Sequence, residues 1–360
     1  MKNTKTNSLL RLVAFLIITV VFIGVVGVMS SEGAEKVPDN DTQSSPESNI
    51  QTPPATDIPA VTIRYENYLS GLFCSKEESE RVPICYSMDP DASLYGVANA
   101  DLTIEFPVEF GQSRLLVYTH KTELSGKIGA IAPLRKYMSY VLSSFGGIIA
   151  HNGYDDTVTY QSANVPVPTI DFSKSTSYSY NEGRGLVYTN SALMSGALNN
   201  LSLPTIETSN ISLPYAFSST YANLVYGTLQ GQNVSIPFGA QNNVRLLYDA
   251  TKDEYRCEQN GIVRIDALDG EVVYYKNVFV LFCDSATYEK AETTELVLDI
   301  TSGGQGYYFT NGTMLKFKWE YNDKDGLTFL DLSGQKLIIN RGNSYIAFYK
   351  STQISSISIY

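Results

Sequence analysis

The strongest constraint on the fold of this chain is a series of short apolar segments, separated by turn residues, that begins near residue 241. Aromatic and aliphatic residues flank Asn260-Gly261 and again Asn311-Gly312. An Asn-Gly pair between two such segments is typical of a β-hairpin with a two-residue turn. The closing run LIINRGNSYIAFY has the same strand-like character. Residues 241–360 are therefore predicted to form a β-rich C-terminal domain.

The composition agrees with a folded, strand-rich protein. Of the 360 residues, 43% are hydrophobic and 18% are charged, which leaves enough apolar surface to bury a core. The 26 tyrosines outnumber the 15 phenylalanines and the single tryptophan, and tyrosine favours half-buried strands. The formal net charge of −11 opposes a nucleic-acid partner.

Residues 61–240 show a mixed pattern. Asp101–Pro107 and Arg114–His120 alternate as strands do, and an apolar strand is expected at Ile148–His151. Pro133 opens a helical stretch that stops at Gly146-Gly147. A second short helix is expected near 191–199. We therefore expect an α+β protein, with a mixed α/β N-terminal domain over 61–240 followed by the β-rich domain.

The N-terminus indicates export. Lys2, Lys5 and Arg11 precede an uncharged run from Leu12 to Met29, which lies at the lower limit of a membrane span. Residues 1–30 are thus either an uncleaved anchor, held in the membrane through residues 9–29, or a signal peptide cleaved after the run. Residues 31–60 are rich in Ser, Thr, Pro and acid, which is typical of a disordered tether.

The four cysteines fall as an early pair and a late pair. In an exported chain an even number favours disulfides, and Cys74–Cys85 with Cys257–Cys283 is the simplest of the three possible connectivities. The spacing and the two histidines of the chain do not provide a zinc ligand set. We expect neither a metal nor a cofactor.

Several segments after residue 61 follow the order and spacing of a known family. NADLTIEFPVEFGQSR at 99–114 and KIGAIAPLR at 127–135 are the longest matches. YDATKDEYRC, the Asn277-Val278 pair, GQGYYFTNG and RGNSYIAF continue the match in the C-terminal part. On these motifs the chain resembles the YerB-like lipoprotein family, exported two-domain bacterial proteins without an agreed biochemical activity.

The chain also departs from that family's pattern. Ala132 stands where the family has an arginine, and Gly185 stands where it has a histidine. The lipid-attachment cysteine of the family is missing, because no cysteine precedes Cys74. An uncleaved helix would provide the same attachment to the membrane.

The matched motifs contribute the candidate ligand-binding residues. Glu105 and Glu109 would stand about 13 Å apart on one strand, at ~3.3 Å per residue, which is too far for a glycosidase-type pair. We expect each carboxylate to pair with Arg114 or Arg135, with ligand binding and catalysis as alternatives. His151 ends a strand and enters a turn with Asp155, where it either meets a ligand or closes the turn. The candidate pocket therefore comprises Glu105, Glu109, Arg114, Arg135, His151 and Asp155, with no catalytic residue assigned.

These features together predict a protein of the bacterial cell envelope with residues 31–360 outside the membrane, or secreted if the signal is cleaved. We expect a binding or scaffolding role at the cell wall, with a wall component or an envelope protein as partner. Two alternatives remain: a cell-wall hydrolase or transferase that uses an acidic residue, and a regulator of such enzymes.

Overall fold

The computed structural model describes residues 64–121, 126–154, 167–202, 211–220, 224–225, 230–290 and 293–360. The expected anchor or signal, including residues 9–29, and the tether at 31–60 lie outside the described residues. Within the described ranges, no helix has both the length and the apolar character that crossing a membrane requires.

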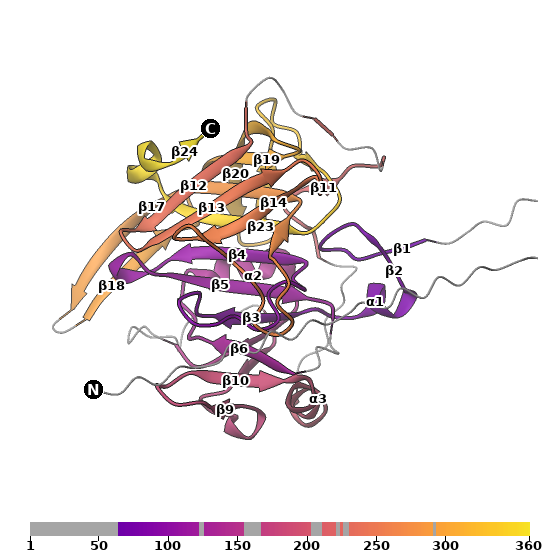
Figure 1. Ribbon diagram of the computed structural model, residues 1–360, viewed down its shortest axis with the longest axis vertical. Helices are drawn as coiled ribbons and strands as arrows, with labels where there is room; N and C mark the ends of the chain where they lie inside the picture. The colour runs from indigo at the N-terminus through magenta and orange to yellow at the C-terminus, as the bar shows by residue number, and fades with distance from the viewer. Residues whose placement is uncertain are drawn as a thin grey trace, which may run out of the picture. The chain divides into compact units, whose positions relative to one another are not determined.

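The largest sheet takes strands from both halves of the sequence. Its order is β21-β20-β19-β17-β23-β4-β5-β3-β6-β10-β9, with β18 beside β17, β7 beside β3, and β8 beside β7 (Figure 1). Its described strands are β3 (Ile84–Met88), β4 (Leu102–Pro107), β5 (Ser113–Thr119), β6 (Lys127–Ile131), β7 (Ile148–His151), β8 (Thr169–Asp171), β9 (Tyr180–Asn181), β10 (Val187–Asn190), β17 (Asn277–Lys290), β18 (Thr293–Asp299), β19 (Gly304–Thr310), β20 (Thr313–Asn322), β21 (Gly326–Leu330) and β23 (Ser344–Lys350).

A second sheet and two short strand pairs complete the β structure of the described residues. The second sheet contains β12 (Asn233–Gly239), β13 (Asn242–Asp249), β14 (Glu254–Gln259), β15 (Ile262–Val263), β16 (Tyr274–Tyr275) and β24 (Ser358–Ile359). The pairs are β1 (Tyr65–Glu66) with β2 (Phe73–Cys74), and β11 (Ala216–Phe217) with β22 (Ile338–Ile339). The helices are α1 (Lys76–Glu80), α2 (Met138–Phe145), α3 (Ser191–Asn200) and the short 3₁₀ helices η1 (Glu109–Gly111), η3 (Thr176–Tyr178) and η5 (Ser351–Ser356).

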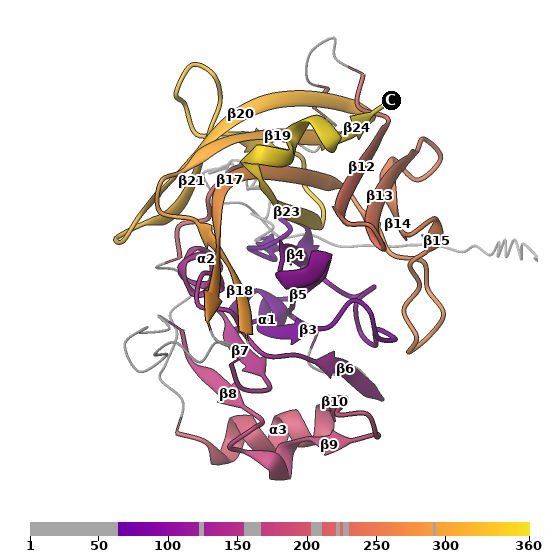
Figure 2. The same ribbon diagram turned by 90° about the vertical axis from the view of Figure 1, so that its left-hand side faces the viewer.

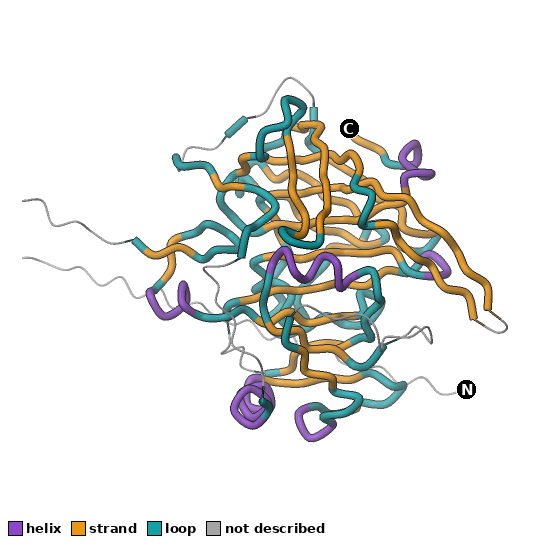
Figure 3. The backbone as a smooth tube through the Cα atoms, turned by 180° about the vertical axis from the view of Figure 1, so that it is seen from behind, coloured by secondary structure: helices purple, strands orange, loops and turns teal. Residues whose placement is uncertain are grey.

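The large sheet is covered on both faces. In Figure 2, α2 lies to the left of β4 and β5, and the strands β12 to β15 lie to the right. Figure 3 shows from behind that α2 lies over the strands of the sheet. Alternate side chains of each strand therefore enter different cores. Val117, Val280 and Tyr345 belong to the core shared with the second sheet. Their neighbours Leu116, Phe279 and Ile346 belong to the core shared with α2.

The expected mixed α/β N-terminal domain is wrong, because the chain is mostly β in both halves. The expected strands near 101–107, 114–120 and 148–151 do form. However, β4, β5 and β3 pair antiparallel as direct neighbours. A parallel α/β sheet would need a helical crossover between such strands, and one helix, α2, covers this part of the sheet instead.

Local turn and cap geometry agrees with the sequence pattern. Asn311 and Gly312 adopt positive φ angles of 51° and 70° between β19 and β20, as a hairpin turn of this type requires. α2 ends at Gly146, whose φ of 64° is a conformation that glycine adopts without steric penalty. The expected second helix is α3, whose N-cap Asn190 accepts a hydrogen bond from the Leu193 amide.

The sheet continues across the boundary expected at residue 240. β23 lies between β4 and β17 and runs parallel to both. Leu102 pairs with Ser344, and Ile104 pairs with Ile346. Residues 61–360 group as one unit by their contacts. A C-terminal strand thus completes the N-terminal part of the sheet and brings residues from both halves to the same places.

Candidate functional site

Glu105 lies in the interior and is fully buried on β4. Its carboxylate accepts hydrogen bonds from Ser113 Oγ at 2.6 Å and from the Tyr345 hydroxyl at 2.8 Å. Arg264 provides the opposite charge, with Nη1 3.5 Å from Glu105 Oε2. The expectation that Arg114 or Arg135 pairs with Glu105 is therefore not met. The partners of this carboxylate, Ser113, Arg264 and Tyr345, thus come from three separate parts of the sequence.

Glu109 does pair with Arg135, as expected. The two side chains form a buried ion pair between Glu109 Oε2 and Arg135 Nη2. The other carboxylate oxygen accepts a hydrogen bond of 2.8 Å from the backbone N–H of Leu296 on β18. Glu109 thus accepts a backbone N–H of β18 that would otherwise lack a partner within the sheet. This is a structural role.

Arg114 contacts Asp89 and the backbone of Ser113. Its Nη1 lies 3.4 Å from Asp89 Oδ1 and donates to the Ser113 carbonyl at 3.2 Å. Glu105, Glu109, Arg114 and Arg135 are thus held in separate contacts in or near the core. None of these four side chains is among the residues that line the cleft described below.

His151 is buried at the end of β7. Its Nδ1 lies 2.9 Å from the carbonyl oxygen of Gly153, so Nδ1 carries the proton. Asp171 accepts the Gly153 N–H at 2.9 Å and fixes the same turn. Burial lowers the pKa of His151. These are the contacts of a turn-closing histidine, while Asp155 lies outside the described residues.

The two expected disulfides are contradicted, because all four cysteines are free thiols. Cys257 faces the core between the two sheets, whereas Cys283 faces the core beneath α2. The large sheet therefore separates the two sulfur atoms. Cys85 is buried in β3, while Cys74 is partly exposed on β2. Burial raises the pKa of Cys257 to about 11 and that of Cys283 to about 12.

A polar cleft of about 530 Å³ opens where the N-terminal and C-terminal halves meet, and we call it the seam cleft. It combines acidic, basic, amide and aromatic side chains from both halves. Its lining residues are Asn67, Ser70, Leu72, Phe73, Glu78, Ala98, Asn99, Ala100, Asp101, Lys121, Lys252, Glu254, Asp269, Glu271, Val272, Tyr274, Lys276, Arg341, Gly342 and Asn343. Such a lining suits a polar ligand that carries charge.

Some of these charged side chains already have hydrogen-bond or ion-pair partners within the protein. Asp101 receives the His120 backbone N–H and ring Nδ1 at 2.8 and 2.9 Å. Arg341 pairs with Glu66 at 2.7 Å. In contrast, Glu254 and Glu271 have no ion-pair partner among the described residues. Burial raises the pKa of Glu254, so its charged form gains from a nearby cation.

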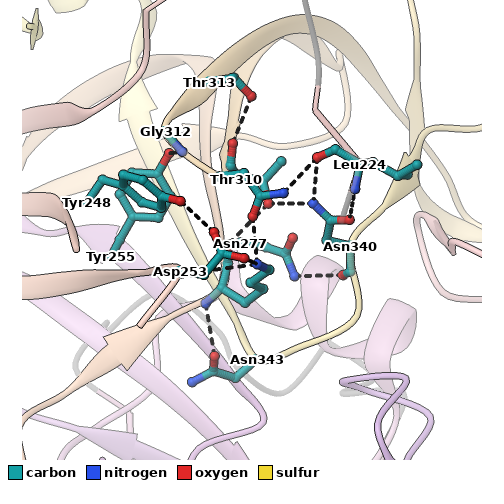
Figure 4. A network of polar contacts seen from close by, with 12 residues as sticks. Leu224, Tyr248, Asp253, Tyr255, Asn277, Thr310, Gly312, Thr313, Asn340 and Asn343 are labelled. Carbon is teal, nitrogen blue, oxygen red and sulfur yellow. Dashed lines mark hydrogen bonds and ion pairs between the residues drawn. The ribbon is translucent and has the colours of Figure 1, made fainter. Parts of the chain in front are cut away.

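Figure 4 shows a polar network that includes Asp253, Asn277 and Asn343, of which Asn343 lines the seam cleft. Lys276 Nζ donates to Asp253 Oδ2 at 2.7 Å, to the Asp253 carbonyl at 3.1 Å and to Asn311 Oδ1 at 2.6 Å. An ammonium group has three N–H donors, so these acceptors satisfy it. Burial, followed by the hydrogen bond to Asp253, raises the pKa of Tyr248 to about 12. Lys276 therefore has a structural role.

Asn277 extends this network into the sheet. Its Nδ2 donates to the carbonyls of Asn340 and Gly342 at 2.9 and 3.3 Å, and its Oδ1 accepts from the Tyr308 hydroxyl at 2.7 Å. Asn277 and the segment around Gly342 lie in motifs that match the family. Gly342 lines the seam cleft, so one of these motifs marks part of it, but the spacing of the motifs does not predict that Glu254 of β14 lines the same cleft.

Comparisons with known proteins agree with the motif match. A model described as the DUF3048 N-terminal domain, of unknown function, matches residues 69–200, and its C-terminal counterpart matches residues 234–346. The "Putative lipoprotein YerB" of Bacillus subtilis (strain 168) is 22% identical over 274 residues, which cover 73% of this chain and 80% of the relative. The crystal structure of YerB from Bacillus subtilis superimposes with a TM-score of 0.68 at 18% identity, covering 82% of this chain and 100% of that one.

Proposed function

The chain belongs to the YerB-like DUF3048 family, and on that premise we propose that it is an extracytoplasmic binding protein of the bacterial cell envelope. A relative named as a lipoprotein, the basic residues before an apolar run and the tether-like composition of 31–60 support this location. In this proposal the N-terminal segment reaches the membrane and the folded part faces the cell wall.

The seam cleft is the observation that carries the proposal. Its lining holds carboxylates, lysines and two aromatic rings, Phe73 and Tyr274. Peptides and amino sugars of a cell wall offer the amines, carboxylates and hydroxyls that such a lining binds. The cleft is therefore the surface that a wall component would occupy.

The enzymatic alternative has less support. It needs an acidic residue that is available to a substrate, and the sequence offers Glu105 and Glu109 for this role. Both carboxylates are buried and engaged, Glu105 with Arg264 and Glu109 with Arg135. Such contacts are those of structural ion pairs.

The test uses the full chain in mild detergent with isolated peptidoglycan sacculi, which remain insoluble. The readouts are co-sedimentation and the release of soluble fragments. We expect the wild type to sediment with sacculi and the cleft variant Asp269→Arg/Glu271→Arg to remain in solution. The matched control Glu320→Arg changes an exposed acid on β20, away from the cleft, and should sediment like the wild type.

Two outcomes would overturn the proposal. A wild-type chain that stays in solution does not bind the wall, and a cleft variant that sediments fully binds it elsewhere. Fragment release by the wild type that is lost in Arg114→Ala would establish the enzymatic alternative instead.

A further inference from the structure

Glu254 and Tyr274 project from the same face of the second sheet. In the antiparallel register of β14 with β16, Arg256 pairs with Tyr274 and Tyr255 pairs with Tyr275. Tyr255 and Tyr275 are fully buried, so the other face of these strands meets solvent. Glu254, two residues before Arg256, shares that face and lines the seam cleft beside Tyr274.

The ring of Tyr274 already holds an ammonium group. Lys252 Nζ lies 4.6 Å from the ring centroid, which is a cation–π contact. Lys252 is exposed, so displacing its ammonium from the ring has a small energetic penalty. This contact shows that the wall formed by Tyr274 and Glu254 suits a positively charged amine.

The cleft also offers the complementary charge, on Lys121. Lys121 belongs to the N-terminal half, and its Nζ donates to Asn99 Oδ1 at 2.7 Å. Its remaining N–H donors can meet an anionic group on a ligand. One cleft thus contains a carboxylate and an aromatic ring from the second sheet and an ammonium from the N-terminal half.

We propose that the seam cleft binds a zwitterionic amino-acid or peptide group, with the ligand's ammonium at Glu254 and Tyr274 and its carboxylate at Lys121. Lys252 occupies the ammonium position until the ligand arrives. This inference rests on the proposed function and names the ligand class of the same cleft.

Three small molecules test which charged groups a ligand needs in order to bind. Diaminopimelate carries amines and carboxylates on a seven-carbon chain, pimelate lacks the amines, and cadaverine lacks the carboxylates. Binding to the full chain in detergent is measured by titration calorimetry. We expect diaminopimelate to bind at least about tenfold more tightly than pimelate, as a charge-assisted contact at Glu254 predicts.

Two substitutions that are close in sequence should act in opposite directions. Glu254→Gln removes the charge that holds the ligand's ammonium and should weaken diaminopimelate binding about tenfold. Lys252→Met removes the competing ammonium from Tyr274 and should strengthen binding several-fold. Glu320→Gln and Lys316→Met are the matched controls, because Lys316 lies over Tyr307 on the large sheet in a similar contact. Neither control should change the affinity.

The carboxylate side has its own variant. Lys121→Met should weaken the binding of diaminopimelate and leave the binding of cadaverine unchanged. The proposal is overturned if diaminopimelate does not bind, if pimelate binds equally well, or if Glu254→Gln and Lys252→Met change affinity in the same direction.

The two proposals fail in distinguishable ways. Sedimentation with sacculi that is unaffected by Glu254→Gln and by added diaminopimelate would retain the wall-binding function and refute this ligand class. Diaminopimelate binding without sedimentation would retain the ligand class and refute binding to the intact wall.

Discussion

The buried carboxylates show how single residues of this protein are held. Glu105 and Glu109 each face one arginine with one carboxylate oxygen, and the other oxygen accepts a hydrogen bond, from Ser113 in Glu105 and from the Leu296 N–H in Glu109. A buried ion pair adds little net stability by itself, but removing one partner leaves an uncompensated charge in the interior. The arginines are therefore the sensitive positions.

Replacing Arg135 with methionine should lower the free energy of unfolding by about 3–5 kcal/mol, because Glu109 would remain buried and charged. The double variant Arg135→Met/Glu109→Gln should recover much of this loss, since the glutamine oxygen can still accept the Leu296 N–H. Denaturant unfolding measures both. Lys76→Met, in an exposed ion pair with Glu80, is the control and should change little. A full loss in the double variant would contradict this explanation.

His151 gives the protein a pH dependence of defined sign. Burial lowers its pKa in the folded state, so the unfolded chain binds the proton more readily near the ordinary value of 6.5. Stability should therefore be highest above that value and fall as the pH drops from about 7 to about 5. His151→Asn should reduce this slope in denaturant unfolding at each pH. Equal slopes in wild type and variant would show that another group causes the dependence.

At the level of elements, the sequence predicts local structure better than pairing. The turn at Asn311-Gly312 and the end of α2 at Gly146 follow from backbone preferences of the residues themselves. The ion pair of Glu109 with Arg135 joins two family motifs that are close in sequence, at 99–114 and 127–135. Glu105, in contrast, is satisfied by Tyr345, which approaches when β23 pairs with β4, and by Arg264, which follows β15 in the C-terminal half. No local preference encodes that pairing.

The incorrect α/β expectation has the same origin. The apolar segment at 148–151 and the helix before it are typical of a βαβ unit, and both elements exist. β7 does pair in parallel with β3 and β8, but β3, β5 and β4 pair antiparallel, and β4 continues into the C-terminal half through β23. The sequence alone does not predict the seam cleft, because Lys121 and Glu254 line the same cleft only after the two halves pair.

Asn277 is the residue on which the start of β17 depends. Asn277→Leu keeps a similar volume but removes three hydrogen bonds, to Asn340, to Gly342 and from Tyr308. It should lower the free energy of unfolding by about 2–4 kcal/mol, because buried carbonyl and hydroxyl groups lose their partners. Gln305→Leu, an exposed substitution on β19, is the control for added apolar surface. An unfolding midpoint equal to that of the wild type would show that water or a shift of β23 replaces these bonds.

At the level of the whole folded part, the central question is whether the halves are independent. β23 is flanked by β17 on one side and β4 on the other, and its residues Tyr345, Ile346 and Phe348 are fully buried. Separating the chain at residue 240 would expose one edge of β4 and one edge of β23, each lined by apolar side chains. Exposed apolar edges favour aggregation over folding.

Residues 61–240 and 241–360, produced separately, should therefore each fail to show a cooperative thermal transition, whereas co-expression should restore one. Circular dichroism and amide hydrogen exchange measure this directly. If residues 241–360 alone unfold cooperatively near the midpoint of the whole chain, the pairing of β23 with β4 contributes little. The C-terminal half would then be the independent domain that its hairpin pattern predicts, and the seam cleft would be an interface between two domains. If neither half folds alone, the pairing of β23 with β4 holds together both parts of the chain that line the cleft, and a ligand meets a site formed before it binds.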